Sequence, residues 1–171
     1  LPDCYACPRG FFGRPIDQPR IDCEACPRGM FGPVAAAPNA SVGCEACIVG
    51  RFSEDDGLEL ADGASGAAEA CKGCPRGRWS GKVGVAQESR CQNCPPGKYG
   101  PDAVGQTSST SCVACVPGRF SEAVGGWEGQ DMCKGCPAGY VQAESGRAYC
   151  LPCMPGTFQT APGRRVCHVC E

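Results

Sequence analysis

Cysteine dominates this sequence, and its spacing is regular along the whole chain. The chain of 171 residues contains 18 cysteines, and all of them fall into nine C-x-x-C pairs. More than one residue in ten is therefore cysteine, a level typical of a cross-linked scaffold. The pairs begin at Cys4, Cys23, Cys44, Cys71, Cys91, Cys112, Cys133, Cys150 and Cys167.

The apolar content explains why cross-links are needed. Leu, Ile, Val and Phe together number 25, too few to offset the conformational entropy of the chain by burial alone. The 25 glycines and 16 prolines disfavour long helices and favour turns and short extended segments. The formal net charge of −2 matches neither a highly charged disordered chain nor a basic nucleic-acid-binding protein. No run of 18 apolar residues occurs, so we expect no membrane insertion within this segment.

The cysteine spacing divides the chain into internal repeats. A glycine stands three residues after the second cysteine of each repeat, which predicts a turn with positive φ. We call it the turn glycine: Gly10, Gly29, Gly50, Gly77, Gly97, Gly118, Gly139 and Gly156. We number the repeats 1 to 8, in a single array, as residues 4–22, 23–43, 44–70, 71–90, 91–111, 112–132, 133–149 and 150–166, with the start of a ninth at 167–171.

An aromatic residue follows the turn glycine by two positions in seven of the eight repeats. We interpret this position as part of a short strand whose aromatic side chain covers a disulfide and the adjoining repeat. A basic residue often lies between the two, as at Arg51 and Arg119. Strand alternation is expected to turn that side chain toward solvent, the alternative being a cation–π ladder between repeats.

Three chemistries use C-x-x-C pairs: zinc binding, redox catalysis and disulfide cross-linking. Zinc would join the pairs two by two, but nine is an odd number, and five of the second cysteines precede a proline that lacks the N–H a thiolate accepts from. A redox C-x-x-C requires a helix N-terminus in a βαβ fold, of which the sequence shows no sign. Disulfides suit a chain this poor in apolar residues and imply an oxidising compartment.

Connectivity does not follow from spacing alone, but the repeat favours a staggered pattern. In this pattern the second cysteine of each pair bonds the first cysteine of the next, which closes every repeat into one loop. Cys4 and Cys170 are then left unpaired or available to another segment. The expected bridges are Cys7–Cys23, Cys26–Cys44, Cys47–Cys71, Cys74–Cys91, Cys94–Cys112, Cys115–Cys133, Cys136–Cys150 and Cys153–Cys167.

Stretches such as CKGCPRGRWS, CQNCPPGKYG and CLPCMPGTFQ resemble the ephrin-receptor-like cysteine-rich repeat and the first half-module of tumour necrosis factor receptor repeats. The resemblance covers nearly the whole chain. It implies a small, disulfide-rich fold, mostly irregular with short β-hairpins, in an elongated tandem-repeat rod with a disulfide ladder. The receptors alternate two module types, whereas this chain repeats one, which favours a uniform rod.

Residues other than cysteine suggest little chemistry. His168 lies inside the last C-x-x-C, where a structural turn explains it, and no catalytic constellation, cofactor or metal site is expected. The acidic loop 53–70 lacks the ligand spacing of an EF-hand calcium site. Asn39-Ala40-Ser41 forms an N-glycosylation sequon, so we expect an N-linked glycan at Asn39. The stretch TSSTS at 107–111 is a weaker candidate for O-linked sugars.

These observations predict a non-enzymatic, secreted or cell-surface structural glycoprotein, such as a segment or subunit of a filament or matrix. The alternative is the ligand-binding ectodomain of a cell-surface receptor, with a protein ligand. The chain opens at Leu1, which we interpret as a processed chain or a slice of a longer one. Because neither terminus resembles the polar cap of a natural solenoid, we expect further copies or further repeats to join it end to end.

Overall fold

The fold is built from small antiparallel hairpins and irregular loops. The structure is a computed structural model that describes residues 6–17, 20–127 and 129–171. Within these residues it contains eight two-stranded antiparallel sheets and no larger sheet. The predicted fold class, disulfide-rich and mostly irregular with short hairpins, is confirmed. By its contacts the chain divides into two compact units: Leu1–Cys74, Ser80–Cys91 and Gly105–Thr107 in one, and Pro75–Trp79, Gln92–Val104 and Ser108–Glu171 in the other.

Seven of the hairpins share one design. The first strand holds the aromatic position after the turn glycine, and the second strand holds the two residues between the cysteines of the next pair. Each strand is two residues long because the turn and the disulfide end the pairing on either side. The pairs are β3 (Met30–Phe31) with β4 (Glu45–Ala46), β5 (Arg51–Phe52) with β6 (Lys72–Gly73), β7 (Arg78–Trp79) with β8 (Gln92–Asn93), β9 (Lys98–Tyr99) with β10 (Val113–Ala114), β11 (Arg119–Phe120) with β12 (Lys134–Gly135), β13 (Tyr140–Val141) with β14 (Leu151–Pro152), and β15 (Thr157–Phe158) with β16 (His168–Val169).

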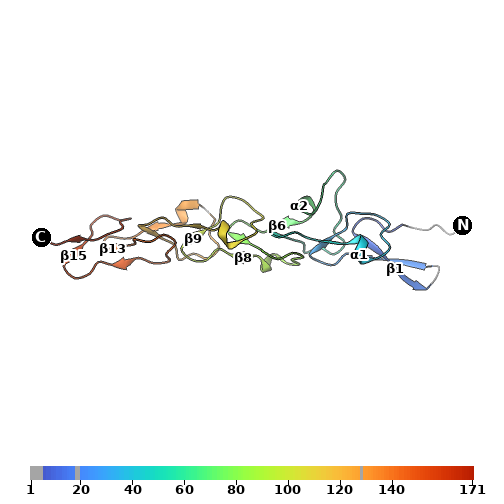
Figure 1. Ribbon diagram of the computed structural model, residues 1–171, viewed down its shortest axis with the longest axis horizontal. Coiled ribbons are helices and arrows are strands. Elements are labelled where there is room, and N and C mark those ends of the chain that lie inside the picture. The colour runs from blue at the N-terminus through green and yellow to red at the C-terminus, as the bar shows by residue number, and fades with distance from the viewer. Residues whose placement is uncertain (1–5, 18–19, 128) are drawn as a thin grey trace. The chain divides into compact units, whose positions relative to one another are not determined.

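The hairpin of repeat 1 is longer than the others. Its strands β1 (Phe11–Asp17) and β2 (Arg20–Ala25) are drawn as the long blue arrows of Figure 1. The pairing runs from Phe11 opposite Ala25 to Asp17 opposite Arg20, with an irregularity before Asp17. In repeat 1, strand pairing therefore extends into the segment between the aromatic position and the next cysteine pair. In the other repeats that segment lies outside the two-residue strands.

Eight disulfides close the repeats, and they join the same cysteines that the staggered pattern pairs: Cys7–Cys23, Cys26–Cys44, Cys47–Cys71, Cys74–Cys91, Cys94–Cys112, Cys115–Cys133, Cys136–Cys150 and Cys153–Cys167. The linked cysteines lie 14 residues apart in repeats 7 and 8, and 16 to 24 apart in the rest. Loop length is therefore the main variable among repeats of one design.

Longer loops end in one short helical turn just before the next cysteine. The cysteine N–H closes the turn, as in the hydrogen bond from Cys44 to the Ala40 carbonyl (2.9 Å). No such turn precedes Cys150 or Cys167 in the described part of the chain. The turns are α1 (Ala40–Gly43), α2 (Ala67–Ala70), η1 (Glu88–Arg90), η2 (Ser109–Ser111) and η3 (Gly129–Met132). None of the described helices has the length and apolar character that a membrane span requires.

The buried residues are mostly the disulfides themselves. Two aromatic positions join them: Phe31 (1% exposed) packs against Cys47 and Cys71, and Phe52 (3% exposed) packs against the Cys74–Cys91 bridge and Val85. These contacts confirm for Phe31 and Phe52 the prediction that the aromatic covers a disulfide of the adjoining repeat. Sulfur replaces much of the aliphatic core that the composition lacks.

Candidate functional site: the junctions between repeats

Backbone hydrogen bonds join successive repeats in a recurring pattern, and the junction of repeats 3 and 4 shows its three bonds. The turn glycine donates to the residue after the next aromatic, and the residue after its own aromatic donates to the next loop. The loop donates back to the second cysteine of the preceding pair. The bonds are Gly50 N–H to Ser80 (2.7 Å), Ser53 N–H to Val85 (3.0 Å) and Gly84 N–H to Cys47 (2.8 Å).

The same geometry recurs along both units, and each bond named here lies within one of them. The N–H groups of three further turn glycines donate to the carbonyl of the residue after the next aromatic position. The pairs are Gly97 with Ser121, Gly118 with Gln142 and Gly139 with Gln159, all at 2.7 Å. The return bonds to the second cysteine run from Gly57 to Cys26, Gly105 to Cys74, Gly125 to Cys94, Gly146 to Cys115 and Gly163 to Cys136, all between 2.7 and 2.9 Å. The junction is therefore a constant feature, although the loops around it vary.

The residue that donates the return bond has positive φ, and in six repeats it is a glycine. This glycine stands seven residues after the turn glycine in repeats 3, 4, 6, 7 and 8, and eight after it in repeat 5. We call it the loop glycine. Its φ is positive everywhere: Gly57 (72°), Gly84 (65°), Gly105 (75°), Gly125 (72°), Gly146 (72°) and Gly163 (72°). Repeat 2 places Ala36 there with φ of 56°, the one non-glycine residue with positive φ among those described.

The turn glycines also have positive φ, between 74° and 86°, which confirms the predicted turn. Six of them contact a loop glycine two repeats further on. A Cβ built on Gly97 would lie 2.1 Å from the Gly146 carbonyl oxygen, and one on Gly50 would lie 2.3 Å from that of Gly105. Any side chain there would collide with backbone, so the repeats couple to second neighbours as well as to first.

A buried polar residue follows the aromatic position in five repeats, that position being held by Val141 in repeat 7, and the sequence pattern did not indicate its role. Its side chain accepts a hydrogen bond from the N–H two residues on, as Ser53 Oγ does from Asp55 (3.3 Å). Such a local bond holds the start of the loop. The five residues are Ser53 (1% exposed), Ser80 (3%), Ser121 (2%), Gln142 (3%) and Gln159 (6%).

The two glutamines belong to the repeats with the shortest loops. Gln142 Nε2 donates to the carbonyl of Tyr149 (2.7 Å), and Gln159 Nε2 donates to that of Val166 (3.0 Å). Both acceptors directly precede the closing cysteine. Where the loop is too short for a helical turn, the longer side chain thus spans the loop from inside.

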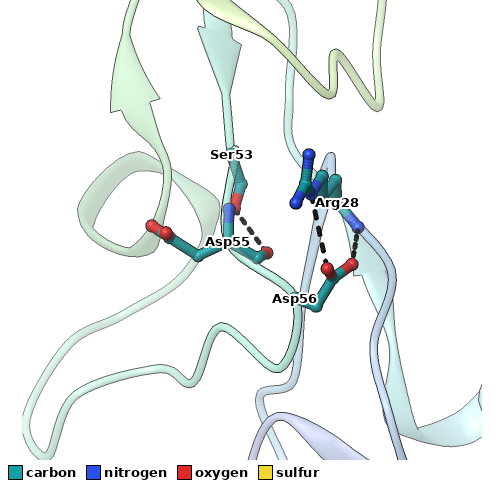
Figure 2. Close-up of polar contacts among 4 residues, drawn as sticks. All are labelled: Arg28, Ser53, Asp55 and Asp56. Atoms are coloured by element: carbon teal, nitrogen blue, oxygen red, sulfur yellow. Dashed lines mark hydrogen bonds and ion pairs between the residues drawn. The ribbon is translucent and has the colours of Figure 1, made fainter.

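Arginines of the P-R-G turns form ion pairs with loop carboxylates. Arg28 donates from its backbone N–H and from Nε to the Asp56 carboxylate (3.1 and 3.3 Å), beside the Ser53–Asp55 contact (Figure 2). Arg76 pairs with Asp102 (2.8 Å) and lies over the Trp127 ring. These groups are partly or largely exposed, so each pair contributes little to stability.

The arginine between turn glycine and aromatic does not simply point to solvent as expected. Arg51 Nη1 donates to the carbonyl of Cys71 (2.7 Å), and Arg119 Nη1 donates to that of Cys133 (2.8 Å). The expected alternation of side chains along a strand fails because a two-residue strand is short enough for a long side chain to reach back across the hairpin.

The pKa of another arginine, Arg147, is raised by its hydrogen bond to the exposed carboxylate of Glu144.

The other predicted site residues lie at the surface or outside the described residues. Cys4 lies outside them, and Cys170 is exposed without a disulfide partner. His168 is exposed in β16, with its ring 6.0 Å from that of Phe158. In the described ranges, no three His, Cys, Asp or Glu side chains gather as metal ligands. The candidate O-glycosylation stretch overlaps the exposed turn η2.

The sequon at Asn39 is exposed at the N-terminus of α1. Its Oδ1 accepts a hydrogen bond from the Val42 N–H (3.2 Å) and caps that short turn. The amide nitrogen, which would carry a glycan, is not used by the cap. The local geometry is therefore compatible with the predicted modification.

A signal for the loop glycine was present in the sequence. The spacing G-x6-G recurs in five repeats, but it is less apparent than the cysteines because these loops are otherwise variable. Comparison with protein-family models and with curated proteins finds no match for this chain. The geometry of the junctions is therefore the basis for a functional assignment.

Proposed function

We propose that this chain is a non-enzymatic, extracellular structural protein whose function is to form a uniform, disulfide-stapled array of repeats. One observation carries the proposal: the same junction recurs between repeats that differ in loop length and composition. A junction that stays the same keeps the spacing between repeats constant, as a structural array requires. In a ligand-binding receptor we would expect one repeat or junction to differ from the others and form the binding site. The resemblance to ephrin-receptor-like repeats supports the same proposal.

An oxidising location supports it further. Eight disulfides and a core made largely of cystine are typical of secreted and cell-surface proteins. A glycan at the exposed Asn39 would add to this character. In this setting we propose that the array joins end to end with further repeats, as a segment or subunit of a filament or matrix.

Solution shape tests the structural function. A compact globular chain of 171 residues has a radius of gyration of about 16 Å. We expect small-angle scattering of the oxidised protein to give a clearly larger value and a rod-like distance distribution. Reduction and alkylation should replace that profile with that of an unfolded coil. A radius close to the globular value would contradict the proposal.

Intact mass tests the chemistry. We expect the secreted protein to gain two hydrogens for each of the eight bridges on reduction, and to lose glycan mass at Asn39 after glycosidase treatment. Thiol titration of the denatured, non-reduced protein should find two free thiols or fewer, and no stoichiometric zinc. Extensive free thiol with bound zinc would end the disulfide account. The Asn39→Gln variant controls for the glycan.

A further inference from the structure

Two Asp-Gly steps lie in the long loop of repeat 3, at Asp56-Gly57 and at Asp62-Gly63, and the sequence contains no other Asp-Gly or Asn-Gly step. An aspartate followed by glycine is prone to cyclise, because glycine has no side chain to hinder its backbone nitrogen and leaves the main chain free to rotate. The two steps therefore share one chemistry and one loop. Their surroundings in the structure differ, and the difference predicts which of them reacts.

The first step is held at both of its reacting groups. The Gly57 N–H donates the return bond to the Cys26 carbonyl (2.7 Å). The Asp56 carboxylate accepts from the backbone N–H and from Nε of Arg28 (3.1 and 3.3 Å; Figure 2). The space around Gly57 is also filled, because a Cβ built there would lie 3.0 Å from the ring of Phe11. Cyclisation at this step would require both groups to leave their partners and the junction to open.

The second step lies in an open turn, which the Ala64 N–H closes by donating to the Ala61 carbonyl (3.0 Å). In the described part of the chain the Gly63 N–H donates no backbone hydrogen bond, and a Cβ on Gly63 would meet no atom within 4 Å. The Asp62 side chain is 99% exposed and pairs with Arg9 (2.7 Å). An ion pair this exposed is weak and opens readily. Neither reacting group is therefore held firmly.

We propose that Asp62 is a site of spontaneous modification to isoaspartate, and that the junction protects Asp56 from the same reaction. The Gly63 nitrogen loses its proton and bonds to Cγ of the protonated Asp62 carboxyl, whose C–O bond breaks so that one water leaves and a cyclic imide remains. Water then adds to either imide carbonyl and breaks its C–N bond. Addition at Cγ restores aspartate, and addition at the main-chain carbonyl leaves isoaspartate. Water is the only co-reactant.

The structure confines the effect of this modification to the loop. The last backbone bond from the start of this loop to an earlier repeat runs from the Leu60 N–H to the Gly32 carbonyl (3.2 Å), so the turn at Asp62 lies beyond the junction. The Cys47–Cys71 bridge closes the loop at its base. The methylene that isoaspartate adds to the main chain therefore leaves the stacked repeats in place, and a long-lived array would accumulate the change. This inference does not depend on the proposed function.

Incubation of the full, oxidised chain in water labelled with heavy oxygen tests the inference, because each imide that opens takes up one labelled oxygen. The chain is then reduced and digested in ordinary water, and cleavage after Glu59 separates the two steps for mass spectrometry. We expect Asp62 to take up at least about tenfold more label than Asp56, since the junction must open locally before Gly57 can react. Fragmentation of the labelled Asp62 peptide should show isoaspartate.

Two controls make the result decisive. In the reduced and alkylated chain, where the junction is absent, both steps should label at similar rates. The variant Asp62→Glu should lose the label from its peptide, because its longer side chain forms the larger ring far more slowly. Equal labelling of the two steps in the oxidised protein, or more at Asp56, would overturn the inference. So would an Asp62 that stays unlabelled in the oxidised protein, or a reduced chain that labels at neither step.

Discussion

Repeat 3 and repeat 7 build the same junction with different interiors. In repeat 3, Cys47 and Cys71 are separated by 24 positions, and the loop between them supplies Leu58 and Leu60, which pack against the Phe31 cluster. In repeat 7, Cys136 and Cys150 are separated by only 14 positions, the loop forms no helical turn, and Gln142 makes hydrogen bonds inside it. Apolar packing and a buried amide are thus two solutions for one backbone frame, and loop length decides between them.

The largest expected effect concerns the apolar interior. Phe52→Ala should lower the free energy of unfolding by about 3 to 4 kcal/mol, because it leaves a cavity beside the Cys74–Cys91 bridge. Thermal unfolding with disulfides intact measures the change. Phe158→Ala is the matched control, since that side chain is 45% exposed, and it should cost well under half as much. Equal costs would show that burial does not distinguish these repeats.

The second effect separates a turn glycine with a second neighbour from one without. Gly97→Ala should cost about 2 to 3 kcal/mol, because Cβ would meet the Gly146 carbonyl and φ is 81°. Gly156→Ala should cost about 1 kcal/mol, since its φ is 83° but no described atom lies near its Cβ. Chemical denaturation of both variants checks the difference. If the two costs were the same, coupling to second neighbours would carry no energy.

The third effect tests the polar interior. Gln142→Ala should cost about 1 to 2 kcal/mol, because the Tyr149 carbonyl and the Glu144 N–H lose their partner. Gln142→Ser should recover part of this, since a serine there can still accept from the N–H two residues on, as Ser53 does. Local amide exchange in repeat 7 measures both. A neutral Gln142→Ala variant would contradict the proposed role of the amide.

The smallest effect is a gain. Ala36 occupies a loop-glycine position with φ of 56°, so Ala36→Gly should stabilise the protein by about 0.5 to 1 kcal/mol through relief of strain. Ala35→Gly is the control, because Ala35 is not among the residues with positive φ, and it should be neutral or slightly destabilising. A loss of stability in Ala36→Gly would mean that the strain is already compensated by the neighbouring contacts.

The sequence predicted the covalent frame better than the contacts between repeats. The disulfide pairs and the turns at the turn glycines were predicted because each requires a particular residue type at a fixed spacing. The aromatic positions were predicted as covers, which holds for Phe31 and Phe52 but not for the exposed Phe158. Burial of the side chain at that position depends on which residues of the neighbouring repeat cover it. The spacing of the repeats alone does not predict those contacts.

Other features were missed because they use ordinary residues in unusual surroundings. Ser53 and Gln142 resemble surface residues in sequence, yet their backbone groups join three successive repeats, and this buries their side chains. The contact of Gly97 with Gly146 joins residues 49 positions apart in the chain, so no local pattern indicates it. Only the stacking of repeats brings such groups together.

The staggered bridges also fix how the chain would carry a pulling force. A covalent path runs from Cys7 through its bridge to Cys23, along two residues to Cys26, and through the next bridge to Cys44. The loops lie outside this path, so tension applied to the ends does not pull on them. The tether is therefore short and nearly inextensible however long the loops become, and the 24-residue step of repeat 3 adds no more slack than the 14-residue step of repeat 7.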